Sequence, residues 1–404
     1  MDFDKLLQLM VQKNGSDLFI TADVPPSMKV NGVIMPVTKS PLNPEQTMQL
    51  VKSVMSPAQI KEFDDTKECQ FAISDKGQTA RFRVSAFIQR DSAGMVLRKI
   101  ETTIPSVEDL NLPMILKEIA MHKRGIVILV GATGTGKSTT LAAMIDHRNQ
   151  NSRGHIITIE DPIEYVHQHK GCIITQREVG IDTLSFEAGL KNTLRQAPDV
   201  ILIGEIRTRE TMDYAIQYAE TGHLVFATLH ANNANQAIDR IIHFFEAEEQ
   251  EQILMDLSLN LRSVIAQQLI PTPDGKGRRA AIEILLNSQL ISDYIRKGEI
   301  HEIKPVMKRS RESGMQTFDQ ALFDLYEAGE ITFQDAIKSA DSPNDLRLLV
   351  KLQSKHAAKI TEEDMDFSLA ADEAPTVNMG MFNRWFYGIK TLFCIKNLYS
   401  QHHA

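Results

Sequence analysis

The sequence predicts an α/β protein in which a smaller mixed module precedes a larger part built on a parallel sheet. Residues 1–102 alternate strand-like runs with helical stretches. From residue 114 to about residue 350, helical patterns separate the apolar runs GIVILV, HIITIE, DVILIGEI and LVFATLH. Short strands that alternate with helices form a parallel sheet with helices on its faces. Residues 103–113 contain two prolines and several turn formers, which indicates a linker.

The first module has the elements of a small sheet with helices. The Asn31-Gly32 pair predicts a tight hairpin turn between two strands. In the run RFRVSAFI, Arg81 and Arg83 alternate with apolar residues and therefore share one face of a strand. We expect helices over residues 4–12 and 44–63, and strands over residues 16–20, 28–30, 68–73, 79–88 and 95–99.

Length and composition restrict the classes of protein that the chain can represent. Its 404 residues suit about two to three domains. A hydrophobic content of 43% favours a globular chain with real cores over global disorder. The net charge of −8, from 44 basic and 52 acidic residues, disfavours a duplex nucleic-acid binder.

Cysteine usage and the N-terminal sequence point to a protein of the cytosol. Cys69, Cys172 and Cys394 lie far apart, which disfavours a zinc ribbon and a disulfide framework and fits a reducing compartment. The N-terminus opens with acids and lacks the apolar core of a signal peptide. Because no run of about 18 apolar residues occurs, we expect no membrane span.

The segment GATGTGKS matches the phosphate-loop pattern G-x-x-x-x-G-K-[ST] in full. It follows a predicted strand and precedes a helical pattern, a context that disfavours the alternative of a chance glycine-rich turn. Backbone N–H groups of such a loop face phosphate oxygens, Lys137 supplies a cation, and Ser138 offers a hydroxyl to Mg²⁺. The nucleotide-binding residues are Gly131, Ala132, Thr133, Gly134, Thr135, Gly136, Lys137, Ser138 and Thr139.

Two acidic sites follow the loop, each at the end of a predicted strand. Glu160, Asp161 and Glu164 cluster around a proline in ITIEDPIEYVH, at the sheet edge where ligands of open α/β sheets bind. Glu205 follows the strand VILI, where a Walker B acid would support Mg²⁺ directly or through water. The alternatives are a solvated acidic loop for the first site and a surface glutamate for the second.

Histidines stand at both ends of the strand predicted in GHLVFATLH. His230 follows the strand and could hydrogen-bond a γ-phosphate, although a lone histidine is often structural. His223 precedes the strand and is the weaker candidate.

In order and spacing, GATGTGKSTTLAAMIDHRN, ITIEDPIEYVH, DVILIGEIR and ETGHLVFATLH resemble the secretion-type ATPases, and within them the PilT/PilU family of type IV pilus retraction ATPases. The resemblance covers about residues 1–345. It implies a PAS-like N-terminal domain, a RecA-like C-terminal domain, and a hexameric ring that hydrolyses ATP with Mg²⁺. It further implies a motor of pilus retraction and twitching motility, which works in the cytoplasm on an inner-membrane platform protein.

The resemblance also implies roles for individual residues. Lys137 and Ser138 form the Walker A site, and Glu205 is the Walker B acid. The Asp box comprises Glu160, Asp161 and Glu164, of which Glu164 polarises the attacking water, and the His box comprises His223 and His230. Arginines of the N-terminal domain reach the nucleotide in this family, which makes Arg81, Arg83 and Arg98 the candidates here. The alternative for these arginines is a charged strand face in solvent.

Two departures from PilT favour the PilU branch of the family. The stretch LISDYIRKGE has Ser292 and Asp293 where PilT proteins carry an Arg-Asn pair, and Phe19 stands where PilT usually has His. PilU-type motors are thought to act with PilT. We therefore expect a homohexamer or a mixed assembly with PilT, and an accessory subunit that binds and modulates PilT is the alternative function.

Two further classes of motor are less compatible with the sequence. Pilus-assembly and type II secretion ATPases typically carry a long extra N-terminal region and a tetracysteine zinc site, and three scattered cysteines cannot build that site. DNA-translocating motors are disfavoured by the acidic charge balance.

Residues 351–404 differ in character from the rest of the chain. Residues 361–375 hold six acids, which indicates a solvated linker, and residues 376–404 hold none. The segment MFNRWFYGIKTLFCIKNLYSQHHA is aromatic and basic, but its cations are spread around a helix of 3.6 residues per turn. We therefore favour a docked or poorly ordered terminus over a helix that binds an anionic membrane surface.

Overall fold

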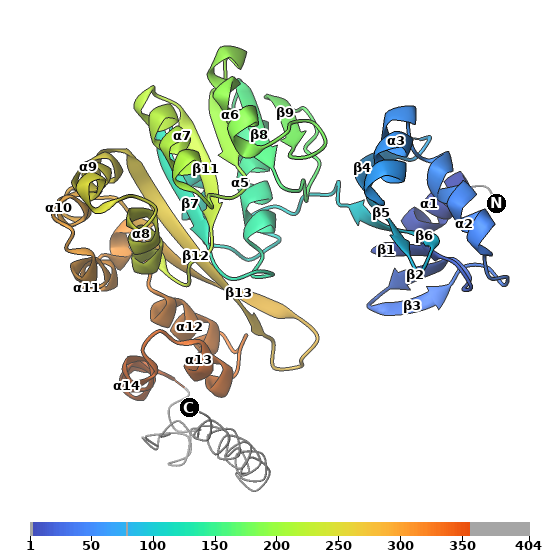
Figure 1. The fold of residues 1–404 in the computed structure, drawn as a ribbon. Helices are drawn as coiled ribbons and strands as arrows, with labels where there is room; N and C mark the ends of the chain where they lie inside the picture. The colour runs from blue at the N-terminus through green and yellow to red at the C-terminus, as the bar shows by residue number, and fades with distance from the viewer. Residues whose placement is uncertain (1–2, 78–79, 356–404) are drawn as a thin grey trace, which may run out of the picture. The chain divides into compact units, whose positions relative to one another are not determined.

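The computed structural model describes residues 3–77 and 80–355, and the acidic and aromatic features predicted beyond residue 355 lie outside this range. The described chain forms two separate sheets, each with its own helices (Figure 1). None of the helices in this range is both long and apolar enough to cross a membrane.

The first sheet has six strands in the order β3-β2-β1-β6-β5-β4, and every neighbouring pair is antiparallel. Its apolar side packs against helices to enclose a core that includes Leu18, Phe82 and Met95. The strands are β1 (Asp17–Thr21), β2 (Ser27–Val30), β3 (Val33–Pro36), β4 (Glu68–Ser74), β5 (Arg81–Gln89) and β6 (Ser92–Ile100). The helices are α1 (Phe3–Gln12), α2 (Pro44–Ser53) and α3 (Pro57–Thr66).

Local sequence signals account for most of this module. Asn31 and Gly32 both have positive φ, at 49° and 82°, and form the predicted turn between β2 and β3. The expected single helix over residues 44–63 was wrong, because the chain breaks before Pro57. Ser56 caps the new helix through its hydroxyl and Pro57 occupies the first turn, where a missing N–H costs nothing.

The second sheet has seven strands in the order β13-β12-β7-β11-β10-β8-β9. All neighbouring strands are parallel except β13, which runs antiparallel to β12. The strands are β7 (Gly125–Val130), β8 (His155–Glu160), β9 (Ile173–Glu178), β10 (Val200–Ile203), β11 (Leu224–Leu229), β12 (Leu261–Pro271) and β13 (Arg278–Leu286). The parallel arrangement expected for the four apolar runs is confirmed.

Helices cover the second sheet and extend beyond it toward residue 355. α5 packs on β7, α7 packs on β7 and β11, and α8 packs on β12 and β13 (Figure 1). The helices are α4 (Ile115–Ala120), α5 (Lys137–Asn151), α6 (Phe186–Lys191), α7 (Arg209–Glu220), α8 (Ala234–Ile242), α9 (Gln250–Asn260), α10 (Gln289–Lys297), α11 (Ile303–Arg309), α12 (Phe318–Glu327), α13 (Phe333–Ser339) and α14 (Pro343–Gln353). Single turns of 3₁₀ helix lie at Thr193–Gln196, Ala247–Glu249, Ile300–Glu302 and Arg311–Ser313.

The hairpin formed by β12 and β13 differs from the helical patterns expected after the fourth apolar run. Most residues of both strands are buried on both faces of the sheet, which removes the alternation that identifies a half-exposed strand. β9 was also not expected, because its polar residues Thr175 and Gln176 interrupt the apolar run.

The segment expected as a linker contains no helix or strand from residue 102 to residue 113. It is nevertheless anchored, because Val107 and Leu112 are buried in the core of the second sheet beside Leu116. Each sheet also buries a thiol, Cys69 in the first core and Cys172 in the second.

Candidate functional site

Four neighbouring strands of the second sheet end around one cavity. β7, β11, β10 and β8 lie side by side in that order and run parallel. Their carboxyl ends therefore meet at one edge of the sheet, where open α/β sheets bind ligands. The phosphate loop follows β7, His230 follows β11, Glu205 comes after β10, and β8 ends with Glu160.

The phosphate loop has a conformation that depends on its glycines. Gly134 and Gly136 have φ values of 78° and 86°, in the left-handed region that favours glycine. A Cβ at Gly136 would also lie 2.8 Å from the side-chain nitrogen of Gln267 on β12. The Lys137 ammonium donates to the carbonyl oxygens of Gly131 and Ala132, each at 2.8 Å. Burial lowers the pKa of Lys137, although the field of Glu205 partly opposes this shift.

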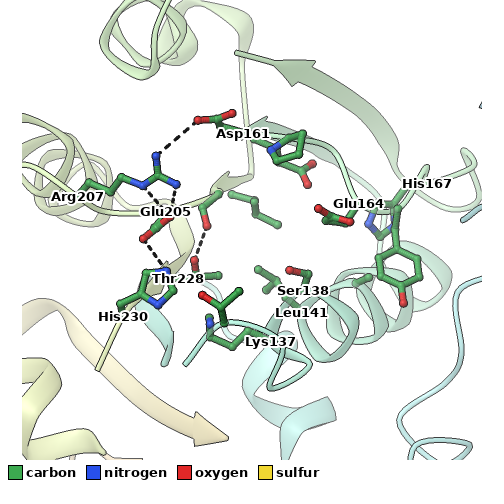
Figure 2. Close-up of a pocket in the computed structure, with 18 residues that line it drawn as sticks. Lys137, Ser138, Leu141, Asp161, Glu164, His167, Glu205, Arg207, Thr228 and His230 are labelled. Carbon is green, nitrogen blue, oxygen red and sulfur yellow. Dashed lines mark hydrogen bonds and ion pairs between the residues drawn. The ribbon is translucent and has the colours of Figure 1, made fainter. Parts of the chain in front are cut away.

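The cavity at this edge has a volume of about 370 Å³. Figure 2 shows Glu205 and His230 at one end of it and Glu164 at the other. Its lining includes nine of the site residues predicted from the sequence, namely Thr133, Gly134, Lys137, Ser138, Glu160, Asp161, Glu164, Glu205 and His230. The remaining lining residues are Leu141, Ala142, Pro162, Tyr165, His167, Leu202, Gly204, Arg207 and Thr228.

Glu205 is held by two side chains that share its carboxylate. The His230 Nε2 atom lies 3.1 Å from Oε1, and Arg207 donates to Oε2 through Nε at 2.7 Å, while its Nη2 forms an ion pair with Oε2 at 2.6 Å (Figure 2). Arg207 Nη1 also lies 3.7 Å from the Asp161 carboxylate. Side chains at the ends of β8, β10 and β11 are thereby linked in one polar network.

Glu160 is a carboxyl group with two opposing influences. Burial raises its pKa to about 7, which favours the protonated form. Hydrogen bonds to Oε1 from Thr158 at 2.6 Å and from Gln176 at 3.2 Å favour the charged form but do not cancel the effect of burial. Glu160 can therefore exchange a proton near neutral pH.

Glu164 lies on the loop after β8, directly before Tyr165 and three residues before His167. Its carboxylate is exposed in the cavity. The next residue, Tyr165, places its hydroxyl 3.0 Å from Thr139 Oγ1 at the start of α5. Burial lowers the pKa of His167 to about 4, so this ring is neutral at physiological pH.

A family model described as Type II/IV secretion system protein matches residues 2–338. The chain belongs to this family. A relative described as type IV pilus ATPase PilU of Pseudomonas aeruginosa is 68% identical over 366 residues, covering 90% of this chain and 96% of that protein. Type IV pilus retractation ATPase PilT of the same organism is 41% identical over 345 residues, covering 85% and 100%.

A solved structure of the pilus retraction motor PilT with bound ADP has a similar fold. Its TM-score is 0.79 at 40% identity, and the match covers 85% of this chain and 98% of that chain. The predicted resemblance to the PilT/PilU family of secretion ATPases is therefore confirmed, and this chain is an ATP-hydrolysing enzyme by family.

Some residues to which the family resemblance gave a role lie away from the cavity. His223 lies at the opposite end of β11 from His230, where its Nδ1 contacts Thr221 and the Tyr218 carbonyl oxygen, so it is not part of this site within one chain. Among the loop residues, Thr135, Gly136 and Thr139 do not line the cavity, and Gly131 and Ala132 line a neighbouring hollow.

The three arginines of the first sheet do not line the cavity either. Arg83 on β5 donates to the Ile163 carbonyl oxygen at 2.9 Å, and its Nε lies 3.5 Å from Glu178 Oε1. Arg98 on β6 donates to Asp17 at 2.8 Å. Arg81 lies on the same face of β5 as Arg83 and contributes to the field at Glu178. The first sheet therefore contacts the loop that carries Glu164 through Arg83.

Sequence reasoning gave no role to four polar residues of the cavity, of which Thr228 lies within β11 and the other three lie on loops after strands. Arg207 stands two residues after Glu205, Tyr165 directly follows Glu164, and His167 stands three residues after Glu164. Position after a strand was the available signal for all three. It could not reveal that Arg207 shares the Glu205 carboxylate or that Tyr165 bonds to Thr139, since both contacts depend on how loops fold back.

Proposed function

We propose that this chain is an ATP-hydrolysing motor of the type IV pilus machine that drives or assists pilus retraction and twitching motility. The observation that carries the proposal is the convergence of four phosphate-loop residues with Glu164, Glu205 and His230 on one cavity. The relatives support it, because this chain aligns with 96% of the pilus ATPase PilU and with 100% of the pilus ATPase PilT.

The phosphate loop is the proposed ATP site. The backbone from Gly131 to Thr139 would surround the phosphates, and Lys137 would exchange its two carbonyl partners for phosphate oxygens. The donor set suits Mg²⁺, since the Ser138 hydroxyl is exposed in the cavity and a hard oxygen ligand is what this ion prefers. Glu205, whose oxygens already contact Arg207 and His230, would reach the ion through water. When bound, Mg²⁺ would neutralise charge on the phosphates.

Hydrolysis needs a positioned water, and the free carboxylate of Glu164 is the proposed group that polarises it. His230 would contact the γ-phosphate from the end of β11, while Glu205 and Arg207 fix its ring. Glu160 and Asp161 would complete the acidic side, where Glu160 can hold or release a proton near neutral pH.

We propose that residues 1–102 form a PAS-like domain and residues 114–350 a RecA-like domain, joined by the linker 103–113. The proposed assembly is a homohexamer, or a mixed ring with PilT, that acts in the cytoplasm on an inner-membrane platform protein. In such a ring, four side chains that lie away from the cavity would contact a neighbouring subunit, namely Arg81, Arg83, Arg98 and His223. No nucleic acid is expected as a partner, in keeping with the net charge of −8.

A second function is an accessory subunit that binds and modulates a PilT motor. It is favoured by the identity to PilU, which exceeds that to PilT, and by Ser292 and Asp293 in α10. A pilus-assembly or type II secretion ATPase is less compatible with three scattered cysteines.

ATP turnover by the purified full chain tests the enzyme. We expect Mg²⁺-dependent phosphate release, which Lys137→Ala abolishes because it removes the cation that binds phosphate. Glu164→Gln should still bind ATP but hydrolyse it about 100-fold or more slowly, since the amide cannot polarise water. Unchanged rates in both variants would contradict the proposal.

Retraction in cells separates the motor from the accessory subunit. Pili that retract in a strain without PilT would exclude a purely accessory role. Full retraction supported by the Lys137→Ala variant, in a strain that contains PilT, would exclude a role as motor.

A further inference from the structure

The loop that carries Glu164 is held at its main chain by two different parts of the molecule. On β9, Gln176 donates to the Tyr165 carbonyl oxygen at 2.9 Å and accepts from the His167 N–H at 2.8 Å. On the other side, the Val166 N–H donates to the Glu101 carbonyl oxygen at 3.0 Å, and Glu101 forms an isolated parallel bridge with Tyr165. Glu101 directly follows β6 and precedes the linker.

The side chain of Tyr165 adds a third connection, to the phosphate loop. Its hydroxyl lies 3.0 Å from Thr139 Oγ1, and either oxygen can donate. Thr139 follows Ser138 in the first turn of α5, and Tyr165 follows Glu164. This contact therefore joins the neighbour of the proposed metal-binding hydroxyl to the neighbour of the proposed water-polarising carboxylate.

We propose that Tyr165 is a positioning residue that fixes Glu164 relative to the phosphate loop and transmits order in that loop to the linker. The tyrosine side chain is stiff, because it has only two side-chain torsions. Tyr165 is also held at both ends: its main chain pairs with Glu101, and its hydroxyl contacts Thr139. A nucleotide that orders the first turn of α5 consequently restrains residues 164–166, and through Val166 it restrains Glu101. The inference rests on the proposed ATPase function.

The rival explanation is that the Tyr165 ring only fills space beside the cavity. Phenylalanine would then serve equally well, because it retains the ring and loses only the hydroxyl. The two explanations differ in what the hydroxyl does, so the test removes that atom alone.

The first measurement is steady-state ATP hydrolysis by the full chain. We expect Tyr165→Phe to lower kcat about two- to tenfold with little change in KM for ATP, because binding survives and the carboxylate is misplaced. Thr139→Val should have a similar effect on kcat, Thr139→Ser should restore it by returning a hydroxyl, and the Tyr165→Phe/Thr139→Val pair should be no worse than either change alone. Tyr294→Phe on α10, away from the cavity, is the matched control and should leave the rate unchanged.

The second measurement is independent of turnover. In the wild type we expect a non-hydrolysable ATP analogue to slow hydrogen exchange at the Val166 amide, whose partner is the Glu101 carbonyl oxygen. In Tyr165→Phe the analogue should bind but fail to slow this amide. A variant with wild-type kcat and the same slowing at Val166 would overturn the inference, whereas an inactive wild type would overturn the proposed function instead.

Discussion

Glu160 shows how one carboxyl can be tuned by its surroundings. Thr158 and Gln176 both donate to Oε1, yet burial dominates and raises its pKa to about 7. The folded protein therefore binds this proton more tightly than the unfolded chain, in which the pKa is close to the ordinary value of about 4.5. The stability associated with Glu160 is full below about pH 4.5 and is lost as the pH rises toward 7.

Glu160→Gln should therefore stabilise the protein at alkaline pH. Glutamine retains an oxygen that can accept both hydrogen bonds and never ionises. We expect it to raise the free energy of unfolding at pH 8 by on the order of 1–3 kcal/mol, with the gain fading toward pH 5. Chemical denaturation at the two pH values measures this. Glu220→Gln, at an exposed position at the end of α7, is the control, and an equal gain at both pH values would contradict the prediction.

At the scale of elements, the conformation of the phosphate loop depends on the neighbouring strand β12 as well as on its own sequence. Gln267 of β12 is buried, and its side-chain oxygen accepts a hydrogen bond from Thr140 at 2.7 Å. Its backbone oxygen would lie 2.5 Å from a Cβ at Gly131, and its amide nitrogen 2.8 Å from a Cβ at Gly136. The β12–β13 hairpin therefore packs closely against the phosphate loop and restricts its conformation through Gln267.

A matched pair of alanine substitutions separates backbone strain from this close approach. Gly134 and Gly136 both have positive φ, but a Cβ at Gly134 would meet nothing within 4 Å. We expect Gly134→Ala to cost about 1 kcal/mol of folding free energy, and Gly136→Ala to cost at least about 1 kcal/mol more because Gln267 must move away from Thr140. Denaturant unfolding without nucleotide measures both costs, and equal costs would argue against the role of Gln267.

Short sequence motifs predicted the elements whose conformation depends on local residues. They did not predict the elements whose formation depends on packing against distant residues. The Asn31-Gly32 turn and the phosphate loop follow from short motifs. The start of a new helix at Pro57 also has a local signal, a capping serine followed by proline, but the prediction did not use it. β12 and β13 gave no alternating pattern because both of their faces are buried. Position after β10 and β11 indicated that Glu205 and His230 lie at one edge, but the 3.1 Å contact between their side chains depends on loop geometry.

At the scale of the whole molecule, one arginine connects the first sheet to the loop of the second. Arg83 donates to Ile163 and lies beside Glu178, whose side chain is only 4% exposed. Burial raises the pKa of Glu178, and Arg83 opposes that shift. Because 80 residues separate Arg83 from Ile163, no local pattern could have predicted the contact.

Removing Arg83 should destabilise the protein mainly by leaving Glu178 buried and uncompensated. We expect Arg83→Ala to lower the unfolding free energy by about 1–4 kcal/mol at pH 8. The deficit should shrink as the pH falls, because without Arg83 the raised pKa of Glu178 rises further and the group becomes neutral. Adding Glu178→Gln should recover much of the loss.

Arg98→Ala is the matched control for this experiment. Arg98 also pairs with a buried acid, Asp17, but within the first sheet. Glu178→Gln should therefore not rescue Arg98→Ala. Thermal unfolding of the two single and two double variants measures the difference, and equal rescue of both arginine variants would exclude a specific contact between Arg83 and Glu178.

The two buried thiols give each sheet its own reporter of unfolding. Burial raises the pKa of Cys69 to about 11, so almost none of it is the reactive thiolate at neutral pH, and Cys172 is 3% exposed within the other core. An alkylating reagent added to the folded protein will leave both untouched until the surrounding core opens. Mass spectrometry of the peptides that carry Cys69 and Cys172 can therefore follow the opening of the two cores separately in one sample. It would reveal which core unfolds first under heat or load.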